Sequence, residues 1–438
     1  RRGINQLTGQ LIYDFIGSLF KIPRSLTGEG VRQTFSKIKS EYLHDLAIHE
    51  IPSGKEVGDW TIPKEWNIYA AYIQNQAGEK IINFEENNLH VVGYSVPINR
   101  KIALQELNEY IYSLPELPDA IPYVTSYYRE TWGFCMADSQ RKNLKDEKYH
   151  VYIDSVLSTG SLTYADFIIP GQQKEEIFFS TYICHPSMAN NELSGPGLAI
   201  YLAKWLTNSS NRYTYRFSFA PETIGAVTYI SKNLNDLKKV YAAFNLTCVG
   251  DENSLSLMPS RKGNTIADRV ARHVLQNQKS SFKEYDFIKD RGSDERQYCS
   301  PGVDLPMVSI MRSKYGEYSE YHTSLDNMDF ISPDGLELSY QIHIECIQIL
   351  EKNFYYKSNI LGEPFLSKRG KNYTIVGGRE NNESRSAQLI LNIMTCCDGS
   401  TDIIDIANLL NIYAYDLIPI FQSLEEDGLI VKVQYLEG

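Results

Sequence analysis

Apolar residues recur every three or four positions in two runs near the start of the chain, at 7–19 and 31–42. This is the spacing of a buried helix face, and the glycines at 28 and 30 mark a turn that starts the second helix. Residues 48–149 differ, because short alternating apolar runs lie between Gly, Asn and Pro turns, with helical spacing only near 103–113. The pattern predicts two amphipathic helices followed by a small, mainly β insert.

Runs of strand length alternate with runs of helical spacing between residues 150 and 355. Strands are expected at 151–157, 177–183, 213–219, 240–246 and 307–311. Helices are expected at 194–206, 223–234, 265–276 and 333–352. The alternation predicts an α/β fold built on a doubly wound, mainly parallel sheet, with its reactive side chains at the carboxyl ends of the strands.

The last part of the chain shows helical spacing at 387–396, 403–410 and 417–424, then a strand pattern at 428–433. Three helices and a terminal strand are typical of a winged-helix-like domain, a type that often binds DNA. Residues 386–438, however, hold eight acidic residues against the single basic Lys432, so no basic helix can face a phosphate backbone. We expect this domain to contact protein or to form a homo-oligomer, with transcriptional regulation as the weaker alternative.

These patterns divide the chain into three predicted domains. Residues 1–47 and 150–357 form the α/β catalytic domain, residues 48–149 form the insert, and residues 365–438 form the winged-helix-like domain. The chain must therefore leave the α/β domain after its second helix and return to it about a hundred residues later.

Composition narrows the choice of function. The 438 residues carry a formal net charge of -11, which repels phosphate backbones and anionic lipid surfaces. No apolar stretch approaches the roughly 20 residues of a membrane-spanning helix, and no apolar signal core follows the first residues. The 7 cysteines are scattered without a Cys-x-x-Cys pair. We expect a cytoplasmic protein with reduced thiols, no membrane association and no broad affinity for nucleic acid.

Polar side chains follow three of the predicted strands. His185 and Glu192 come after the second strand, Glu222 after the third, and His322 after the fifth. Taken singly, such a histidine is more often a packing residue, and such a glutamate is equally well a helix-terminal acid. Because all four fall at strand ends of one sheet, the pattern favours a shared site in which imidazoles and a carboxylate bind a metal ion.

The spacing of these residues resembles the zinc aminopeptidase-like fold of bacterial leucyl aminopeptidases, glutaminyl cyclases and related peptidases. The resemblance rests on His185, the Asn-x-x-Ser-Gly stretch at 191–195, Glu222, residues 292–295, and His322 with Asp326. Residues 25–30, 58–66, 120–128 and 184–195 are more closely similar to a bacterial family of uncharacterised aminopeptidase-like proteins. That resemblance implies an inserted β domain, a winged-helix carboxyl terminus and an association with surface-polysaccharide gene clusters.

Carried over residue by residue, the resemblance implies a reduced metal site. His185 and His322 match the histidine ligands of a two-zinc centre, one for each ion, and Glu222 matches its general base. Three carboxylates of that centre fall on the neutral residues Asn191, Thr223 and Thr247. Because two zinc ions repel each other unless anionic ligands offset their charge, a mononuclear zinc site is favoured.

A mononuclear site needs one carboxylate beside the two imidazoles, and Glu192, Glu222 and Asp251 are all open choices. We take Glu192 as the third ligand and Glu222 as the base that accepts a proton from water. The resemblance also places Asp294 near the substrate or the metal, although a capped turn is an equal alternative for this residue.

Substrate contacts are assigned to four residues, with a further arginine and an aromatic segment as weaker candidates. Asp251 and Glu295 are placed beside the substrate, and Arg291 and Arg296, with Arg261, suit a substrate carboxylate, although solvated arginines are the more common case. The aromatic segment at 121–132 forms either a wall of the cleft or a packing surface of the insert.

The combined prediction is a zinc-dependent hydrolase of an amide bond. It would be an aminopeptidase, or a deacylase acting on an amino-sugar-like small molecule. The alternative is a non-catalytic binding or assembly protein that keeps the fold after losing the two-metal centre, because three of the expected carboxylates are missing.

Overall fold

The computed structural model describes residues 7–370 and 382–434. These residues form two compact units. The larger unit contains the described residues up to Asp268 together with Phe282–Gln341, and the smaller one contains Arg269–Ser281 and the described residues from Ile342 onward. All residues of the predicted metal and catalytic site lie in the larger unit.

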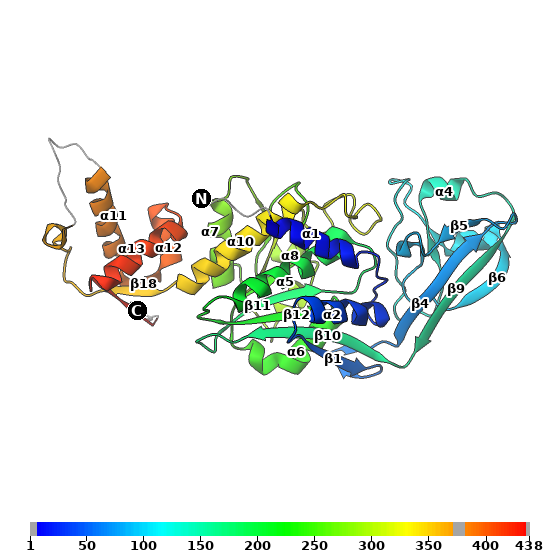
Figure 1. Cartoon of the computed structure of the whole chain (residues 1–438), viewed down its shortest axis with the longest axis horizontal. Helices are drawn as coiled ribbons and strands as arrows, with labels where there is room; N and C mark the ends of the chain where they lie inside the picture. Colours follow the sequence, from blue (N-terminus) through cyan, green and yellow to red (C-terminus); the bar gives the residue numbers. More distant parts are fainter. Residues whose placement is uncertain (1–6, 371–381, 435–438) are drawn as a thin grey trace. The chain divides into compact units, whose positions relative to one another are not determined.

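An eight-stranded sheet lies at the centre of the larger unit (Figure 1). Its strands are β1 (Ala47–Pro52), β10 (Ser161–Ile169), β11 (Glu176–Tyr182), β12 (Thr214–Ala220), β13 (Val240–Asn245), β14 (Ser256–Met258), β15 (Lys283–Glu284) and β16 (Met307–Met311). The central strands run in the order β12, β11, β13, β16 and pair in parallel, whereas β1 and β10 at one edge and β14 near the other pair antiparallel. The predicted α/β class with a largely parallel sheet is confirmed, but the sequence did not predict the antiparallel strands β1 and β10.

Helices cover both faces of this sheet. They include α1 (Leu7–Leu19), α2 (Glu29–Glu41), α5 (Ser194–Thr207) and α6 (Ile224–Leu237). The larger unit also holds the short helices α8 (Phe287–Asp290) and α9 (Glu295–Tyr298), whereas α7 (Ile266–Gln276) and α10 (Pro333–Lys352) have residues in both units. The chain passes from β11 through α5 to β12, and from β12 through α6 to β13. Because β12 and β13 lie on opposite sides of β11, these connections run in opposite directions and place α5 and α6 on opposite faces (Figure 1). The carboxyl end of β11 is therefore the point of the sheet where ligands are expected to bind.

The insert forms a separate antiparallel sheet of four strands in the order β5, β4, β9, β6. They are β4 (Glu65–Gln74), β5 (Lys80–Asn83), β6 (Ile98–Ala103) and β9 (Lys148–Ser158). The strand predicted at 151–157 is part of β9, which pairs with β4 and β6 and not with the main sheet. That assignment was wrong because the apolar side of β9, with Tyr149, Val151 and Ile153, packs in the core of the insert.

The helical spacing near 103–113 corresponds to one short helix and the turn that follows it. The segment holds α3 (Leu104–Leu107), a 3-10 turn (Asn108–Tyr110) and β7 (Ile111–Tyr112). Leu107 and Ile111, four positions apart, both pack in the core of the insert, which accounts for the helical spacing. The remaining short elements of the larger unit are β2 (Glu56–Val57), β3 (Trp60–Thr61), β8 (Phe134–Cys135), α4 (Asp138–Lys142), the 3-10 turn Asn88–His90 and the π-helical turn Ala189–Leu193.

The smaller unit contains helices and a three-stranded antiparallel sheet in the order β18, β17, β19. Its elements are β17 (Tyr355–Ser358), a 3-10 turn (Leu366–Arg369), α11 (Asn382–Cys396), β18 (Asp398–Asp402), α12 (Ile403–Leu410), α13 (Ala414–Glu426) and β19 (Ile430–Val433). The predicted helices and terminal strand are present. β17 pairs with both other strands, so this sheet takes in residues before the predicted domain start at 365.

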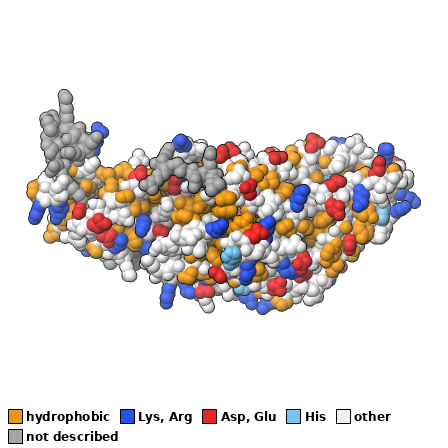
Figure 2. All heavy atoms as spheres, in the orientation of Figure 1, with side chains coloured by type: hydrophobic (Ala, Val, Ile, Leu, Met, Phe, Trp, Pro, Cys, Tyr) orange, Lys and Arg blue, Asp and Glu red, His pale blue; other side chains and the backbone are white. Residues whose placement is uncertain are grey.

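Three further features concern the surface charge, the length of the apolar helices and the cysteines. On the face drawn in Figure 2, the described acidic and basic side chains are interspersed and form no broad basic surface. Among residues 7–370 and 382–434, no single helix is long and apolar enough to cross a bilayer; only α12 and α13 taken together, with a bend of 116° between them, meet those two criteria. All 7 cysteines are free thiols, and only Cys396 is not buried.

Gly195 in α5 tests how closely this helix packs on the sheet, and Gly17 in α1 is the comparison. A Cβ at Gly195 would lie 2.2 Å from the Leu246 carbonyl oxygen, whereas a Cβ at Gly17 would meet only Met328 Cε at 3.5 Å. We expect Gly195→Ala to lower the free energy of unfolding by about 1–3 kcal/mol through overlap. Gly17→Ala should raise it by up to about 1 kcal/mol because alanine favours the helix. Urea unfolding followed by circular dichroism measures both changes, and equal effects would contradict the packing.

Candidate metal and catalytic site

The loops after β11 and β16 bring the two predicted histidines together. His185 lies just beyond the end of β11 and is only 3% exposed, while His322 lies between β16 and α10. Their ring centroids are 5.5 Å apart. Residues separated by more than a hundred positions in the sequence therefore form one site at the carboxyl ends of the parallel strands.

Tyr123 of the insert segment covers both histidines. Its ring centroid lies 5.2 Å from each imidazole, and its backbone N–H donates to the His322 carbonyl oxygen at 2.8 Å. Pro122 and Thr323 form an isolated β-bridge beside this contact. Trp132, in contrast, stacks on Tyr110 inside the insert. Tyr123 therefore packs against the two histidines, Trp132 packs within the insert, and a wall of a substrate cleft stays a prediction.

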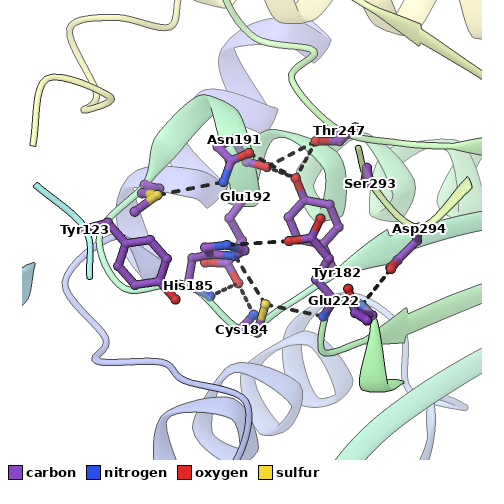
Figure 3. A network of polar contacts seen from close by, with 12 residues as sticks. Tyr123, Tyr182, Cys184, His185, Asn191, Glu192, Glu222, Thr247, Ser293 and Asp294 are labelled. Atoms are coloured by element: carbon purple, nitrogen blue, oxygen red, sulfur yellow. Dashed lines mark hydrogen bonds and ion pairs between the residues drawn. The ribbon is translucent and has the colours of Figure 1, made fainter. Parts of the chain in front are cut away.

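Glu222 lies beside His185 at the end of β12. The two side chains point toward each other in Figure 3, with Glu222 Oε2 3.6 Å from His185 Nε2. Two donor atoms on one tetrahedral zinc ion lie about 3.4 Å apart, which follows from zinc bonds of about 2.0–2.2 Å. His322 Nε2 is buried and has no hydrogen-bond partner among the described residues. The site therefore offers a pair of atoms at ligand spacing and an unpartnered imidazole nitrogen.

Burial keeps both imidazoles neutral. It holds the pKa of His185 well below its usual range, assisted by the neighbouring His322 and Arg24, and it lowers the pKa of His322 to about 4. A neutral imidazole has a lone pair to give to a metal ion, whereas a protonated one has none. The two rings are therefore in the form that a zinc site requires at neutral pH.

The nearby acids are shifted in the opposite direction. Burial, reinforced by the charge of Asp294, raises the pKa of Glu222 well above its usual range. Burial also raises the pKa of Asp294 to about 7, although the carboxylate accepts the Thr223 backbone N–H at 2.7 Å. Arg296 donates to Thr223 Oγ1 at 3.1 Å and opposes the shift of Glu222. These contacts place Asp294 and Arg296 next to the predicted base.

Glu192 holds the turn that presents His185. Its Oε1 accepts the backbone N–H groups of Cys184 and His185, the latter at 2.7 Å, and its Oε2 lies 3.5 Å from Arg24 Nε. Burial raises the pKa of Glu192 to about 7, and Arg24 opposes this. The predicted third ligand is thus close to the site but already engaged, and its role as a ligand stays a prediction.

Cys184 is a competing donor that the sequence analysis did not name. Its Sγ lies 3.2 Å from His185 Nδ1 and accepts the Glu222 backbone N–H at 3.3 Å. Ligand atoms of Cys184, His185 and Glu192 all lie within 4.8 Å of one another. A cysteine directly before a candidate ligand histidine at a strand end was the signal available in the sequence.

A neutral hydrogen-bonded group includes two of the positions where the resemblance implies carboxylates. The Tyr182 hydroxyl lies 2.6 Å from Thr247 Oγ1, 2.6 Å from the Asn191 carbonyl oxygen and 3.1 Å from Asn191 Oδ1 (Figure 3). Thr223, at the third position, bonds to Asp294 and Arg296. No member of the group carries the negative charge that a second cation would need, which favours one metal ion over two. Sequence reasoning missed Tyr182 because it lies within an ordinary apolar strand.

The contacts of three other predicted residues differ from those expected. The Asp251 carboxylate accepts hydrogen bonds from Asn190 Nδ2, Asn253 N–H and both the N–H and hydroxyl of Ser313. Glu295 accepts the N–H groups of Gly292 and Ser293 and the Tyr315 hydroxyl. Arg291 is exposed, follows the end of α8 and donates to the Ile288 carbonyl oxygen of that helix. Asp251 and Glu295 therefore fix loops, and contact of these two residues or of Arg291 with a substrate stays a prediction.

Arg261 also has a structural partner in place of the predicted anion. It pairs with Asp304 at 2.6 Å and donates from Nε to the Cys299 carbonyl oxygen at 2.9 Å. Among the four predicted substrate-binding residues, Arg296 alone contacts a residue of the site.

Comparison with known proteins identifies the family. Residues 13–353 match a family described as a domain of unknown function, DUF4910, and residues 354–432 match a winged helix-turn-helix family. A Clostridium acetobutylicum protein, provisionally named for polysaccharide biosynthesis and an aminopeptidase-like domain, is 45% identical over 401 residues, covering 91% of each chain. The chain therefore belongs to the DUF4910 family, and its winged-helix carboxyl-terminal part is confirmed.

Solved structures agree with this assignment. A crystal structure from Clostridium acetobutylicum, provisionally described as a peptidase, has a TM-score of 0.91 at 41% identity and covers 98% of this chain and 97% of that one. A zinc aminopeptidase from Bacillus subtilis has a TM-score of 0.55 at 12% identity, covering 77% of this chain and 94% of that one. The second likeness shows the fold alone, and it confirms the aminopeptidase-like architecture predicted from the sequence.

Metal analysis tests the pairing of the two histidines. We expect about one zinc ion per chain in protein purified without chelator, because two neutral imidazoles and one anionic donor suffice for a catalytic zinc site. His185→Ala and His322→Ala should each remove most of this zinc. His150→Ala is the matched control, since His150 bonds to Asn99 in the insert sheet. Mass spectrometry of the eluted metal decides the question, and two zinc ions per chain, or zinc retained in both site variants, would contradict a mononuclear site.

Proposed function

We propose that this member of the DUF4910 family is a zinc-dependent hydrolase of an amide bond, acting on a peptide or on an N-acylated, amino-sugar-like small molecule. The observation that carries the proposal is the His185–His322 pair, with ring centroids 5.5 Å apart and Glu222 3.6 Å from His185. The relatives provisionally named as a peptidase and as carrying an aminopeptidase-like domain support the hydrolase class.

His185 and His322 would hold the zinc ion, with Glu192 as the third donor. A zinc ion at this position would polarise a carbonyl group and acidify a water molecule. The protein supports this arrangement by burying both rings, which keeps them unprotonated, and by fixing the backbone of His185 through Glu192. The preformed turn reduces the conformational freedom lost when ligands assemble.

Glu222 is the proposed general base. Thr223, the next residue, has a φ of +64°, in the left-handed region that a β-branched residue rarely adopts. This conformation is stabilised by the hydrogen bonds of Thr223 to Asp294 and Arg296. The turn keeps the half-buried Glu222 beside His185, where a raised pKa suits proton transfer near neutral pH.

A second candidate function is favoured by the neutral group of Tyr182, Asn191 and Thr247. A protein that has exchanged three anionic ligand positions for neutral residues can keep the fold and bind a ligand without cleaving it. The winged-helix part, with its acidic residues, would then mediate contacts with protein. The buried histidines and Glu222 favour the enzyme, because a binding protein has no need of a base with a raised pKa beside two neutral imidazoles.

Activity measurements on Glu222→Gln test the enzyme directly. We expect a loss of about 10²–10⁴-fold in kcat/KM for amide hydrolysis, with zinc content retained, because the variant removes the proton acceptor. The substrates are a panel of N-acetyl amino sugars, N-acyl amino acids and aminoacyl anilides, with released amine as the readout. Glu252→Gln, at an exposed position, is the matched control. Loss of zinc together with activity would make Glu222 a ligand, and full activity would remove it from the mechanism.

The pH profile tests the neighbours of Glu222. Activity requires the ionised base, so it is present above the pKa of Glu222 and lost as pH falls through that value. Asp294 raises this pKa and Arg296 lowers it. Asp294→Asn should therefore move the acid limb of kcat/KM to lower pH by about one pH unit, and Arg296→Gln should move it to higher pH by a similar amount. Shifts in the same direction in both variants would show that the limb belongs to another group.

A further inference from the structure

The two ring nitrogens of His185 face different neighbours. Nδ1 lies 3.2 Å from Cys184 Sγ, whereas Nε2 lies 3.6 Å from Glu222 Oε2. Figure 3 shows these two contacts on different sides of the imidazole. The His185 side chain is only 3% exposed, so its neighbours, and not bulk water, decide which nitrogen carries the proton.

Only one of the two neutral forms of His185 gives its N–H a partner. With the proton on Nδ1, the ring donates to the Cys184 sulfur, which lies within hydrogen-bond reach of a sulfur atom. With the proton on Nε2, the N–H would face Glu222 across 3.6 Å, which is too long for a hydrogen bond. A buried N–H without an acceptor is rarer in proteins than a buried acceptor without a donor. The geometry therefore favours the form with the proton on Nδ1.

The same sulfur also holds the turn of the proposed base. It accepts the Glu222 backbone N–H at 3.3 Å, so contacts from two loops converge on one atom. Cys184 follows β11 and Glu222 follows β12, and these strands pair in parallel, which fixes the spacing of the two loops. Cys184 is only 2% exposed, and its own backbone N–H donates to Glu192. The sulfur is therefore fixed in place and can orient the ring that lies against it.

We propose that Cys184 is a positioning residue of the candidate metal site, which holds His185 in the form whose free lone pair is on Nε2. This nitrogen lies beside Glu222, and the ring of His322 lies 5.5 Å from the His185 ring. A ligand histidine whose second nitrogen donates to an acceptor is fixed in orientation and protonation, which strengthens metal binding. The inference rests on the proposed zinc site. Cys184 would act through His185, without contacting zinc or substrate.

A direct bond from the Cys184 sulfur to the metal ion is the main alternative. Ligand atoms of Cys184, His185 and Glu192 lie within 4.8 Å of one another. An ion bound by the sulfur and the ring would take the lone pair of Nδ1, because Nδ1 is the nitrogen beside the sulfur. The proton would then be on Nε2, where the N–H lacks an acceptor, and the ion would lie on the side of the ring away from Glu222. The contacts therefore favour the sulfur as an acceptor over the sulfur as a ligand.

Zinc affinities of Cys184→Ala and Cys184→Ser test the positioning role. Alanine removes the acceptor, so we expect zinc to bind about 10–100-fold more weakly. Serine keeps an acceptor atom at this position, so most of the affinity should return. Cys135→Ala is the matched control, because Cys135 is a buried free thiol in β8 of the insert. Competition with a chromophoric chelator measures the affinities, and an unchanged affinity in Cys184→Ala, or no recovery in Cys184→Ser, would overturn the proposal.

Magnetic resonance of the imidazole nitrogens separates positioning from a merely structural role. The full chain is labelled with nitrogen-15 in its histidine rings, and His185→Ala identifies the signals. In metal-free protein we expect the proton on Nδ1 of His185 in the wild type and in Cys184→Ser. Cys184→Ala should show a mixture of both neutral forms, because neither nitrogen then has an acceptor, and thermal unfolding checks that the variants fold. A proton on Nε2 in the wild type, or an unchanged signal in Cys184→Ala, would overturn the proposal.

X-ray absorption at the zinc edge distinguishes the acceptor from the ligand. Zinc–sulfur bonds of about 2.3 Å are separable from zinc–nitrogen bonds of about 2.0–2.1 Å. We expect no sulfur around the zinc ion of the wild-type chain. A sulfur neighbour that is lost in Cys184→Ser would make Cys184 a ligand and overturn the proposal.

Failure of this inference is distinct from failure of the proposed function, because the form of His185 is read in metal-free protein. A proton on Nδ1 that depends on Cys184, in a chain that hydrolyses no amide, would keep the positioning role and remove the enzyme. Zinc-dependent hydrolysis with the proton on Nε2 would keep the enzyme and remove the positioning role.

Discussion

The buried carboxylate of Glu192 organises the candidate site. One oxygen accepts the backbone N–H groups of Cys184 and His185, so the turn after β11 has a defined conformation. The other oxygen faces Arg24, which ties the segment after α1 to the same turn. Without this acceptor, two buried N–H groups would lack a partner, at a cost of about 1–3 kcal/mol each, and the buried guanidinium of Arg24 would keep only the Leu19 carbonyl oxygen. The position of the His185 ring, and with it the spacing to His322 and Glu222, therefore depends on Glu192.

Low charge in the site is the second constraint. Asn191, Thr223 and Thr247 stand where the resembling two-zinc centre has carboxylates, and Tyr182 bonds to two of them. Burial raises the pKa of the remaining acids, Glu222 and Asp294; the charge of Asp294 adds to the shift of Glu222, and that of Glu295 adds to the shift of Asp294. Fewer fixed anions would favour one bound cation over two, so this constraint bears on the metal count of the proposed site.

The insert takes part in the site and is not merely an added domain. Its Tyr123 donates to the His322 backbone, where φ is +55°, and so holds the loop after β16 in an unusual conformation. Loops placed on a rigid sheet commonly carry function, and here a segment of the insert packs against both histidines.

The sequence by itself determined the α/β class, because strand and helix periods alternate along the chain, and it placed His185, Glu222 and His322 at strand ends, where parallel topology brings them to one edge. It also indicated the loss of three carboxylates. Only the tertiary structure decided that β9 pairs within the insert, that Asp251 and Glu295 fix loops, and that Tyr182, Cys184 and Arg24 surround the site. Periodicity reports which face of an element is buried, but not which distant element covers it. Those contacts depend on pairing and hydrogen bonding between residues far apart in the chain, such as Arg24 and Glu192, and no local pattern encodes them.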